Sequence, residues 1–250
     1  MKLAVLSDVH GNLEALNAVL ADISTQNANQ IVFLGDAVGY GADPEACVVK
    51  IRENADIVLS GNHDHAATLD TELDGFNPEA QASLIWTRSA LTVSCRSYLA
   101  ELPLRRSARH IMLTHGSPAK PEQWDYVLST GQASRAFAAC PHRLMFVGHS
   151  HVPGIFVELE YKRMFAGEIR RVEQVPSDRV RVEDQYRYLF DVGGVGQPRD
   201  NDPRASYGLY DSDAEEYRLI RVPYDVDKAA EKIRAAGLPE TSAERLAQGR

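Results

Sequence analysis

The sequence predicts an α/β protein in which a largely parallel β-sheet comes first and a strand-rich second half follows. Between residues 2 and 60, short apolar runs alternate with amphipathic helical segments, which is typical of parallel strands covered by helices. A similar run followed by a polar turn returns near residues 109 and 144. From residue 154 to 222, helix signals are few and strand-like runs follow one another. We therefore expect an antiparallel or mixed second sheet packed on the first.

The composition is that of one globular domain spanning residues 1–250. It is 44% hydrophobic and 25% charged, with a formal charge of −8, which argues against a broad surface for long nucleic acids. No apolar run approaches the ~18 residues of a membrane span. Lys2–Leu6 begins a strand-like run with no signal-peptide pattern, and the three cysteines form no CxxC pair. We expect a cytoplasmic protein with neither a membrane nor a long nucleic acid as partner.

The individual elements follow from apolar periodicity and from capping residues. Asn12, Asp43 and Asn77 each stand where a helix would begin, the last two before a proline at the first helical position. The expected helices are residues 13–23, 44–53, 78–91, 93–99, 131–139 and 225–236. The expected strands are residues 2–7, 30–34, 56–60, 109–114, 144–147, 155–159, 168–175, 179–183, 187–192, 206–210 and 216–222. We expect a loop at 65–76 and a frayed end over the last dozen residues.

The helices at about 77–100 are predicted to be an insertion. They could form a cap beside a site or an interaction surface, and the sequence does not choose between these two roles. Together with the sheet edges, they could support a homodimer.

Side chains that commonly bind metal ions follow the first five predicted strands. They are Asp8, His10, Asp36, Asn62, His115, His149 and His151. Because the carboxyl ends of parallel strands share one edge of an α/β sheet, residues spread over about 140 positions can converge there. The spacing of two residues in Asp8/His10 and in His149/His151 suits a strand end and does not suit a helix.

The chemistry of this set predicts two metal ions. Carboxylate, amide and imidazole ligands without thiolate favour Mn, Fe, Zn or Ni over an all-oxygen Mg or Ca site, and we expect Mn first among the four. Seven ligands are too many for one tetrahedral ion and suit two ions if one carboxylate bridges them. Two ions ~3.5–4 Å apart can clamp the attacking and leaving oxygens of a phosphoryl displacement and lower the pKa of a bridging water toward ~7.

Taken together, these motifs resemble the five motifs of calcineurin-like metallophosphoesterases. The matching segments occur in the family's order between residues 8 and 151: Asp8-Val9-His10, Gly35-Asp36, Gly61-Asn62-His63-Asp64, His115-Gly116 and Gly148-His149-Ser150-His151. The resemblance implies a sandwich of two packed mixed sheets flanked by helices.

The resemblance also implies a role for each residue. One ion would be held by Asp8, His10 and His151, the other by Asn62, His115 and His149, with Asp36 bridging the two. His63 would contact the phosphate and protonate the leaving oxygen, a task that suits a side chain with an unperturbed pKa of ~6.5. Asp64 would orient His63 or a ligand.

Further residues resemble one branch of the family. Tyr40 and Asp64 stand where Ser/Thr protein phosphatases have arginine and glutamate, so protein dephosphorylation is not expected. The pattern resembles small bacterial phosphodiesterases and diadenosine tetraphosphatase-like relatives, as does the segment 193–199, although residues 191, 192 and 194 depart from the usual form. Arg199 could pair with a substrate phosphate or be exposed in a Gly-rich turn. Tyr40 and His65 are further substrate candidates, and the other tyrosines and tryptophans are read as core or surface.

The predicted function is hydrolysis of phosphodiester or phosphoanhydride bonds in small, nucleotide-type substrates, with a bridging hydroxide as nucleophile and His63 as acid. Phosphomonoester hydrolysis is the alternative within the enzyme class, and cleavage of short oligonucleotides is a third possibility. A non-catalytic interaction scaffold of the same fold, as in a retromer subunit, is the alternative from another class. The presence of all seven ligand types and His63 disfavours it.

Overall fold

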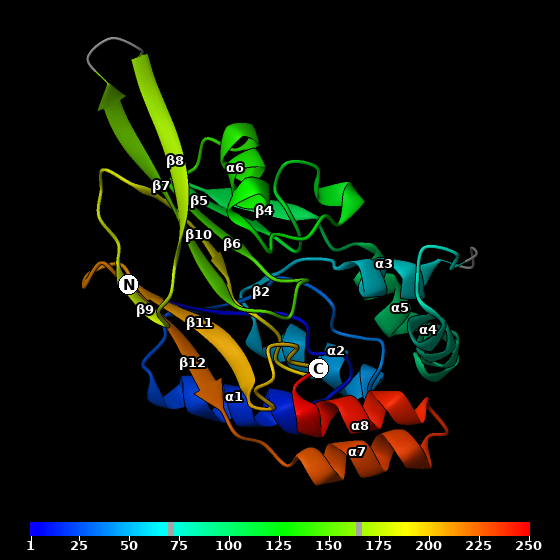
Figure 1. Ribbon diagram of the computed structural model, residues 1–250. Coiled ribbons are helices and arrows are strands. Elements are labelled where there is room, and N and C mark those ends of the chain that lie inside the picture. Colours follow the sequence, from blue (N-terminus) through cyan, green and yellow to red (C-terminus); the bar gives the residue numbers. More distant parts are fainter. Residues whose placement is uncertain (70–72, 164–166) are drawn as a thin grey trace.

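Two six-stranded sheets form the frame of the computed structural model, which describes residues 1–69, 73–163 and 167–250 (Figure 1). The first sheet has the order β3-β2-β1-β11-β12-β9. Its strands are β1 (Lys2–Leu6), β2 (Gln30–Phe33), β3 (Ile57–Val58), β9 (Arg179–Arg181), β11 (Ala205–Asp211) and β12 (Glu216–Val222). The strands β1, β2 and β3 are parallel, whereas β11, β12 and β9 join them as antiparallel neighbours.

The second sheet has the order β4-β5-β6-β10-β7-β8, and its central strands β5, β6 and β10 are parallel. Its strands are β4 (Arg105–Ala108), β5 (Ile111–Thr114), β6 (Leu144–Val147), β7 (Gly154–Arg163), β8 (Gly167–Val175) and β10 (Arg187–Asp191). The predicted strand at 109–114 is thus the second arm of a hairpin, with Arg109 in the left-handed conformation of its turn.

This division corrects the expectation that the first half makes one sheet and the second half the other. Each sheet instead contains strands from both halves of the chain. The strands β1–β3 form one sheet with β11, β12 and β9, whereas β5 and β6 form the other with β10. Along β1, Leu3 and Val5 pack between the sheets, and Ala4 and Leu6 pack toward the helices. A strand that is buried on both faces reads as a continuous apolar run, so its sequence does not reveal which sheet it joins.

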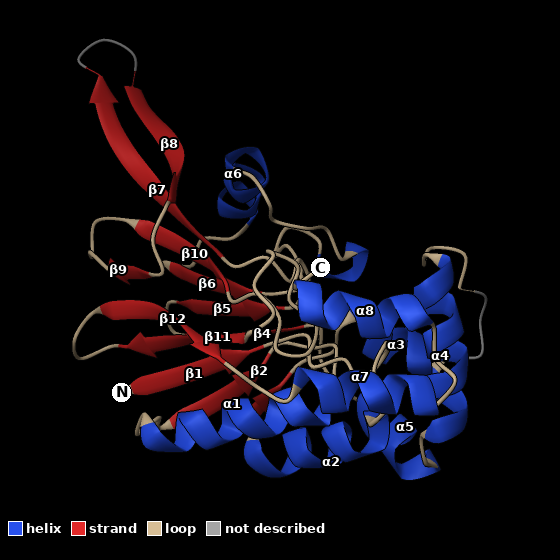
Figure 2. Cartoon of the chain, turned by 60° about the horizontal axis from the view of Figure 1, so that its bottom comes forward, coloured by secondary structure: helices blue, strands red, loops and turns tan. Residues whose placement is uncertain are grey.

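In the described ranges there are eight helices, of which some cover the sheets and the others lie beyond the strand ends or against other helices (Figure 2). They are α1 (Leu13–Thr25), α2 (Pro44–Asn54), α3 (Asn62–Thr68), α4 (Pro78–Ala90), α5 (Val93–Ala100), α6 (Thr130–Ala139), α7 (Val226–Ala235) and α8 (Glu240–Gln248), with a short 3₁₀ turn η1 (Pro121–Gln123). The helices α1 and α2 pack on the outer face of the first sheet, and α6 packs on that of the second. Asn12 and Asn77 cap α1 and α4 as predicted. No helix in the described ranges has the length and apolar character of a membrane span.

Two local predictions were wrong. Residues 62–68 form α3 instead of a turn followed by a loop, because backbone hydrogen bonds begin at the Gly61 carbonyl; residues 70–72 of the predicted loop lie outside the described part of the chain. The last residues form α8 instead of fraying. Ala243 and Leu246 pack in the cluster of α7 and α8, and the carbonyl of Gly249 accepts a hydrogen bond from the N–H of Asn201.

Candidate metal centre

The predicted ligands converge where the carboxyl ends of the parallel strands of both sheets meet. The loops gather there, between the strand ends and the helices (Figure 2). Asp8 follows β1, Asp36 follows β2, and Asn62 is the first residue of α3, after β3. From the second sheet, His115 follows β5 directly, and His149 and His151 follow β6. Each sheet therefore supplies part of the set.

Most of these ligands sit on an unusual backbone. Asp8, His10, Asp36, His149 and His151 all adopt the left-handed conformation, with φ between 48° and 66°. A non-glycine residue rarely adopts this region, and each instance costs about 1–3 kcal/mol unless the surroundings hold it. The surroundings here include the Asp8 N–H bonded to the Gly35 carbonyl and the His10 N–H bonded to that of Asp36. Such turns fold the side chains back over the strand ends.

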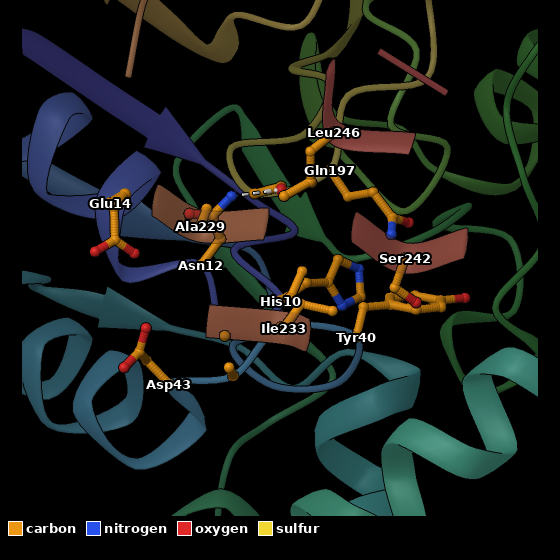
Figure 3. Close-up of a pocket in the computed structure, with 14 residues that line it drawn as sticks. His10, Asn12, Glu14, Tyr40, Asp43, Gln197, Ala229, Ile233, Ser242 and Leu246 are labelled. Carbon is orange, nitrogen blue, oxygen red and sulfur yellow. Dashed lines mark hydrogen bonds between the residues drawn. The ribbon is translucent and has the colours of Figure 1, made fainter. Parts of the chain in front are cut away.

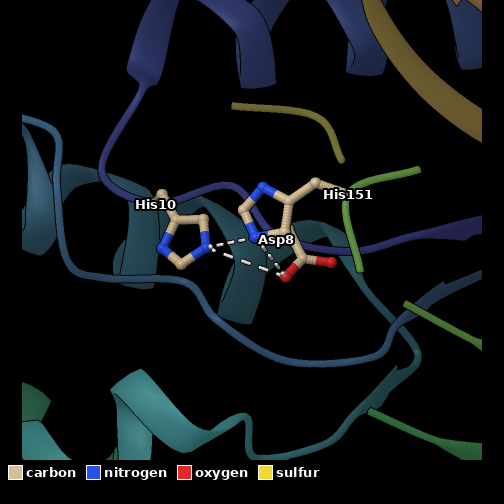
Figure 4. A group of neighbouring side chains, drawn as sticks. All are labelled: Asp8, His10 and His151. Carbon is tan, nitrogen blue, oxygen red and sulfur yellow. Dashed lines mark hydrogen bonds and ion pairs between the residues drawn. The ribbon is translucent and has the colours of Figure 1, made fainter. Parts of the chain in front are cut away.

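One ligand group consists of Asp8, His10 and His151, whose side chains point toward one another (Figure 4). His151 Nε2 lies 3.2 Å from Asp8 Oδ1 and 3.1 Å from His10 Nε2. Both imidazoles donate from Nδ1 to a backbone carbonyl, that of Val38 for His10 and that of Gln197 for His151. Because a carbonyl can only accept, Nδ1 of each ring carries a proton, and Nε2 is left as the atom that can offer a lone pair to a metal ion. Two facing lone pairs beside a carboxylate suit a shared cation.

The second ligand group consists of Asp36, His115 and His149. His115 Nε2 lies 3.3 Å from Asp36 Oδ2 and 3.8 Å from Asp8 Oδ1, so it links this group to the first. Asn62 lines one cavity together with Asp36 and His149, and its Oδ1 is buried without a hydrogen-bond partner among the described residues. A third combination, His10, Asp36 and His63, is also close enough to hold an ion. The two groups are therefore contiguous.

The buried negative charges of the cluster favour the binding of a cation. Asp8 and Asp36 are fully buried, and one oxygen of each lacks a hydrogen-bond partner in the described chain. Burial alone would raise the pKa of both carboxyls, but neighbouring imidazoles hold each well below its usual range. Burial lowers the pKa of His149 to about 3 and that of His151 to about 4, so both rings are neutral at pH 7. Buried carboxylates of this kind are paired or bind metals.

His115 carries the compensating charge within the chain itself. Burial lowers its pKa, but the Asp36 and Asp8 carboxylates more than offset this and raise it to about 9. A divalent cation would replace that proton, because metal ligands must be deprotonated. Two ligands 2.0–2.1 Å from one ion lie about 2.9–3.4 Å apart. The spacings of 3.1, 3.2 and 3.3 Å given above fall in this range, and the His10 Nε2 to Asp8 Oδ1 distance of 3.7 Å is slightly longer. The residues present therefore fit divalent metal ions.

His63 lies at the wall of the cavity, whereas Asp64 lies in the protein interior. His63 lines the cavity, is 5% exposed, and burial lowers its pKa well below the usual value despite the Asp36 charge. Asp64 is fully buried, and its carboxylate accepts backbone N–H groups from residues 36, 37, 38 and 61 at 2.7–3.3 Å. Burial and the Asp36 charge raise the pKa of Asp64 to about 7, against these donors. Asp64 thus positions the turn that carries Asp36.

A cavity of about 460 Å³ opens beside the cluster. Tyr40, His65 and Arg199, the three predicted substrate residues, all line it. The Arg199 guanidinium lies 5.7 Å from the centre of the Tyr40 ring, and Nη2 donates to Gln197 Oε1 at 2.8 Å.

Sequence reasoning missed three aromatic residues of this cavity, Phe76, Trp124 and Tyr126. Trp124 and Tyr126 were read as core or surface, and Phe76 was placed only within the expected loop at 65–76. The one signal for Trp124 and Tyr126 is their spacing, two aromatic residues two positions apart in the loop that follows the His115 motif. Phe76 has no such signal.

The C-terminal helices close the back of the cluster. His10 and Tyr40 line a small cavity of about 10 Å³ whose other walls include Ile233 of α7 and Leu246 of α8 (Figure 3). In the same region, Asn12 Nδ2 donates to the carbonyl of Gly196 at 2.9 Å, which ties the first turn to the Gly-rich segment. The Gly-rich segment thus contacts both α1 and the cluster, since its Gln197 also binds His151.

Comparison with known proteins agrees with this geometry. The model of the calcineurin-like phosphoesterase superfamily domain matches residues 1–215. The chain belongs to this superfamily. A metallophosphoesterase from Sphaerobacter thermophilus is 38% identical in sequence, with 100% of this chain and 99% of that chain covered and a TM-score of 0.84.

Two further relatives carry no assigned activity. An uncharacterized protein of Methanocaldococcus jannaschii is 37% identical, covering 99% of this chain and 98% of its own length. A hypothetical protein from Pyrococcus horikoshii OT3 shares the fold, at 20% identity, with 100% and 98% of the two chains covered and a TM-score of 0.76. The family and the two-sheet sandwich predicted from the motifs are thereby confirmed. Membership in this superfamily supports a hydrolase of phosphate esters that uses divalent metals.

Proposed function

We propose that the protein hydrolyses phosphodiester or phosphoanhydride bonds in small, nucleotide-type substrates with two divalent metal ions. The observation that carries this proposal is the contact between the two ligand groups. His10 Nε2 of the first lies 3.6 Å from Asp36 Oδ2 of the second, and His115 Nε2 of the second lies 3.8 Å from Asp8 Oδ1 of the first. Two ions in adjoining groups could share Asp36. When bound, such a pair polarises the phosphoryl group and lowers the pKa of water.

The ligand assignment follows the two groups. Asp8, His10 and His151 would hold one ion, and Asn62, His115 and His149 the other, with Asp36 between them. Nitrogen and oxygen donors without thiolate suit Mn, Fe, Zn or Ni, and Mn is our first choice. The chain itself fixes the orientation of these ligands, because the buried hydrogen bonds of His10 and His151 hold their imidazole rings in one orientation.

Two further residues would act on the substrate. His63 lies in the cavity next to Asp36, whose Oδ1 accepts the His63 backbone N–H at 2.8 Å. From there its protonated form would donate a proton to the leaving oxygen, and the lowered pKa makes that form a stronger but less populated acid. Arg199, with a buried Nε that has no hydrogen-bond partner in the described chain, would bind a phosphate oxygen. A homodimer through α4 and α5 stays a prediction.

The test is metal-dependent hydrolysis with metal content measured on the same sample. The protein would be stripped with chelator, reloaded with Mn, Ni, Fe or Zn separately, and assayed on bis-p-nitrophenyl phosphate and p-nitrophenyl phosphate. The variant His63→Ala should lose diester hydrolysis about 10²–10⁴-fold. His110→Ala, the same change at an exposed turn, is the matched control. A preference for the monoester would favour a phosphomonoesterase, and failure to bind any metal would favour the scaffold.

A further inference from the structure

The loop between β5 and α6 carries two aromatic residues into the cavity wall. Trp124 follows η1 in the left-handed conformation, with φ 55°, which is an outlier for a bulky residue. The loop folds back on Gly116, where a Cβ would lie 3.0 Å from the carbonyl oxygen of Asp125, and the Ser117 N–H donates to that oxygen at 2.8 Å. Backbone outliers held by their surroundings cluster at ligand sites. The fold thus fixes Trp124 next to the His115 turn.

Both rings lie directly beside predicted metal ligands. The Trp124 ring is 5.9 Å from the His115 ring, centroid to centroid, in an edge-on arrangement. The Tyr126 ring stacks on His149 at 4.3 Å with an interplanar angle of 8°. Tyr126 is 42% exposed and Trp124 is half-buried, so both keep surface open toward the cavity that they line. A group attached to a phosphate at the metal centre would meet these rings first.

The remaining walls suit a ligand with a flat apolar part and an anionic end. Ala66 and Phe76 line the cavity on the α3 and α4 side, and Arg199 supplies a positive charge. Small-ligand sites combine such apolar linings with a few orienting polar groups. Aromatic side chains stack on nucleobases and tolerate any base, because every base has a π face.

From this arrangement we infer that Trp124 and Tyr126 form a subsite for a planar aromatic group, of the nucleobase class, joined to the phosphate at the metal centre. This inference rests on the proposed function and deepens it by assigning residues to substrate choice. Trp124 and Tyr126 are specificity-determining residues here, and neither takes part in the bond cleavage itself. The enzyme should then prefer nucleotide esters to esters of alkyl alcohols.

A binding experiment tests this without turnover. The chain has two tryptophans, and Trp86 lies on α4 among the apolar residues of the α7 and α8 cluster. In the variant Trp86→Phe, emission comes from Trp124 alone. The metal-loaded variant would be titrated with adenosine 5′-monophosphate, glycerol phosphate and inorganic phosphate, with excitation at the red edge of the tryptophan band. The nucleotide should quench the emission and bind about tenfold more tightly than glycerol phosphate.

Variants of Trp124 then locate the effect. By calorimetry, Trp124→Leu should lose the tenfold advantage of the nucleotide, and Trp124→Phe should retain part of it, because phenylalanine still offers a ring. In turnover assays, the ratio of kcat/KM between a nucleotide diester and an alkyl diester should fall about tenfold in Trp124→Leu.

The outcomes separate this inference from the proposed function. Equal binding of the three ligands would overturn the subsite, and so would a nucleotide preference that survives in Trp124→Leu. A preference that Trp124→Leu abolishes, in a protein that hydrolyses no phosphate ester, would support the subsite while the proposed function fails.

Discussion

The Asp64 side chain holds the backbone of Asp36, and the Asp36 side chain in turn holds the backbone of the helix turn that carries Asp64. Asp64 Oδ2 accepts the Asp36 N–H at 2.7 Å, and Asp36 Oδ1 accepts the N–H of His63, the neighbour of Asp64, at 2.8 Å. The start of α3 and the turn after β2 are therefore locked together. This lock places Asp36, the proposed bridging ligand, and His63, the proposed acid, in one rigid unit.

Replacing Asp64 with asparagine should weaken metal binding without touching a metal ligand. An amide NH₂ would face backbone N–H groups where a carboxylate oxygen now accepts them. We expect a loss of about 1–3 kcal/mol in stability and about 10–100-fold in metal affinity, measured by chemical denaturation and by metal titration. Asp56→Asn is the matched control, because the exposed Asp56 accepts a single N–H, from Ile31, outside the site. Unchanged metal affinity in Asp64→Asn would contradict the positioning role.

Gly61 should not tolerate alanine. A Cβ at this position would lie 2.0 Å from Asp36 Oδ1 and 2.4 Å from the Asp36 nitrogen, so Asp36 would have to move. We expect destabilisation of at least about 1–3 kcal/mol together with reduced metal content after reconstitution. Gly131→Ala in α6, where a Cβ would approach no more closely than 4.0 Å, should be neutral or stabilising. Normal stability and metal content in Gly61→Ala would show that the turn is more adaptable than its packing indicates.

Metal loading should stabilise the fold, and the two ligand groups should be separable. At a free metal concentration 100 times Kd, one bound ion adds about 2.7 kcal/mol to the free energy of unfolding. Wild-type protein should bind two ions, whereas His151→Ala and His115→Ala should each retain one, measured by metal analysis and by the shift in Tm on metal addition. His110→Ala should behave like the wild type. A single ion in the wild type, lost in both variants, would replace the two-metal proposal with a mononuclear site.

The ion pairs of Glu14 should stabilise the packing of α7 on α1 in a pH-dependent way. Glu14 Oε1 lies 2.8 Å from Lys232 Nζ and 3.2 Å from Lys228 Nζ, and the side chain is nearly buried. Burial would raise the pKa of Glu14, but Lys232 and Lys228 lower it below its ordinary value. The ion pairs therefore stabilise the folded state above the unfolded-state pKa of ~4.3, and this stabilisation is lost as the pH falls.

The corresponding variant is Glu14→Gln. It should be less stable than the wild type by about 1–2 kcal/mol at pH 7, and the difference should shrink below about pH 4. Denaturant titrations at both pH values measure it, with Glu231→Gln on the exposed face of α7 as control. A difference that grows on acidification would show that Glu14 is not paired as a carboxylate.

Much of the site could be predicted because its signals are local. Asp8, Asp36, His115 and His149 each stand two positions after the last residue of an apolar run, and the side-chain types alone indicate metal chemistry. The helices α1 and α4 were predicted within a few residues, since Asn12 and Asn77 cap them through their own side chains. The α3 helix was missed because it begins at the site motif itself, where Gly61 and Asn62 are typical turn residues.

What the sequence determined by itself is the set of strand–turn units and the ligand types that each turn carries. Apolar periodicity reports that a face is buried and does not report what covers it. The tertiary structure therefore decided that β10 and β11 join different sheets, that α8 packs under the cluster, and that Trp124 and Tyr126 face the cavity. It also decided the left-handed conformations of Asp8 and His10, because their hydrogen-bond partners lie on the neighbouring turn after β2, more than 25 residues along the chain.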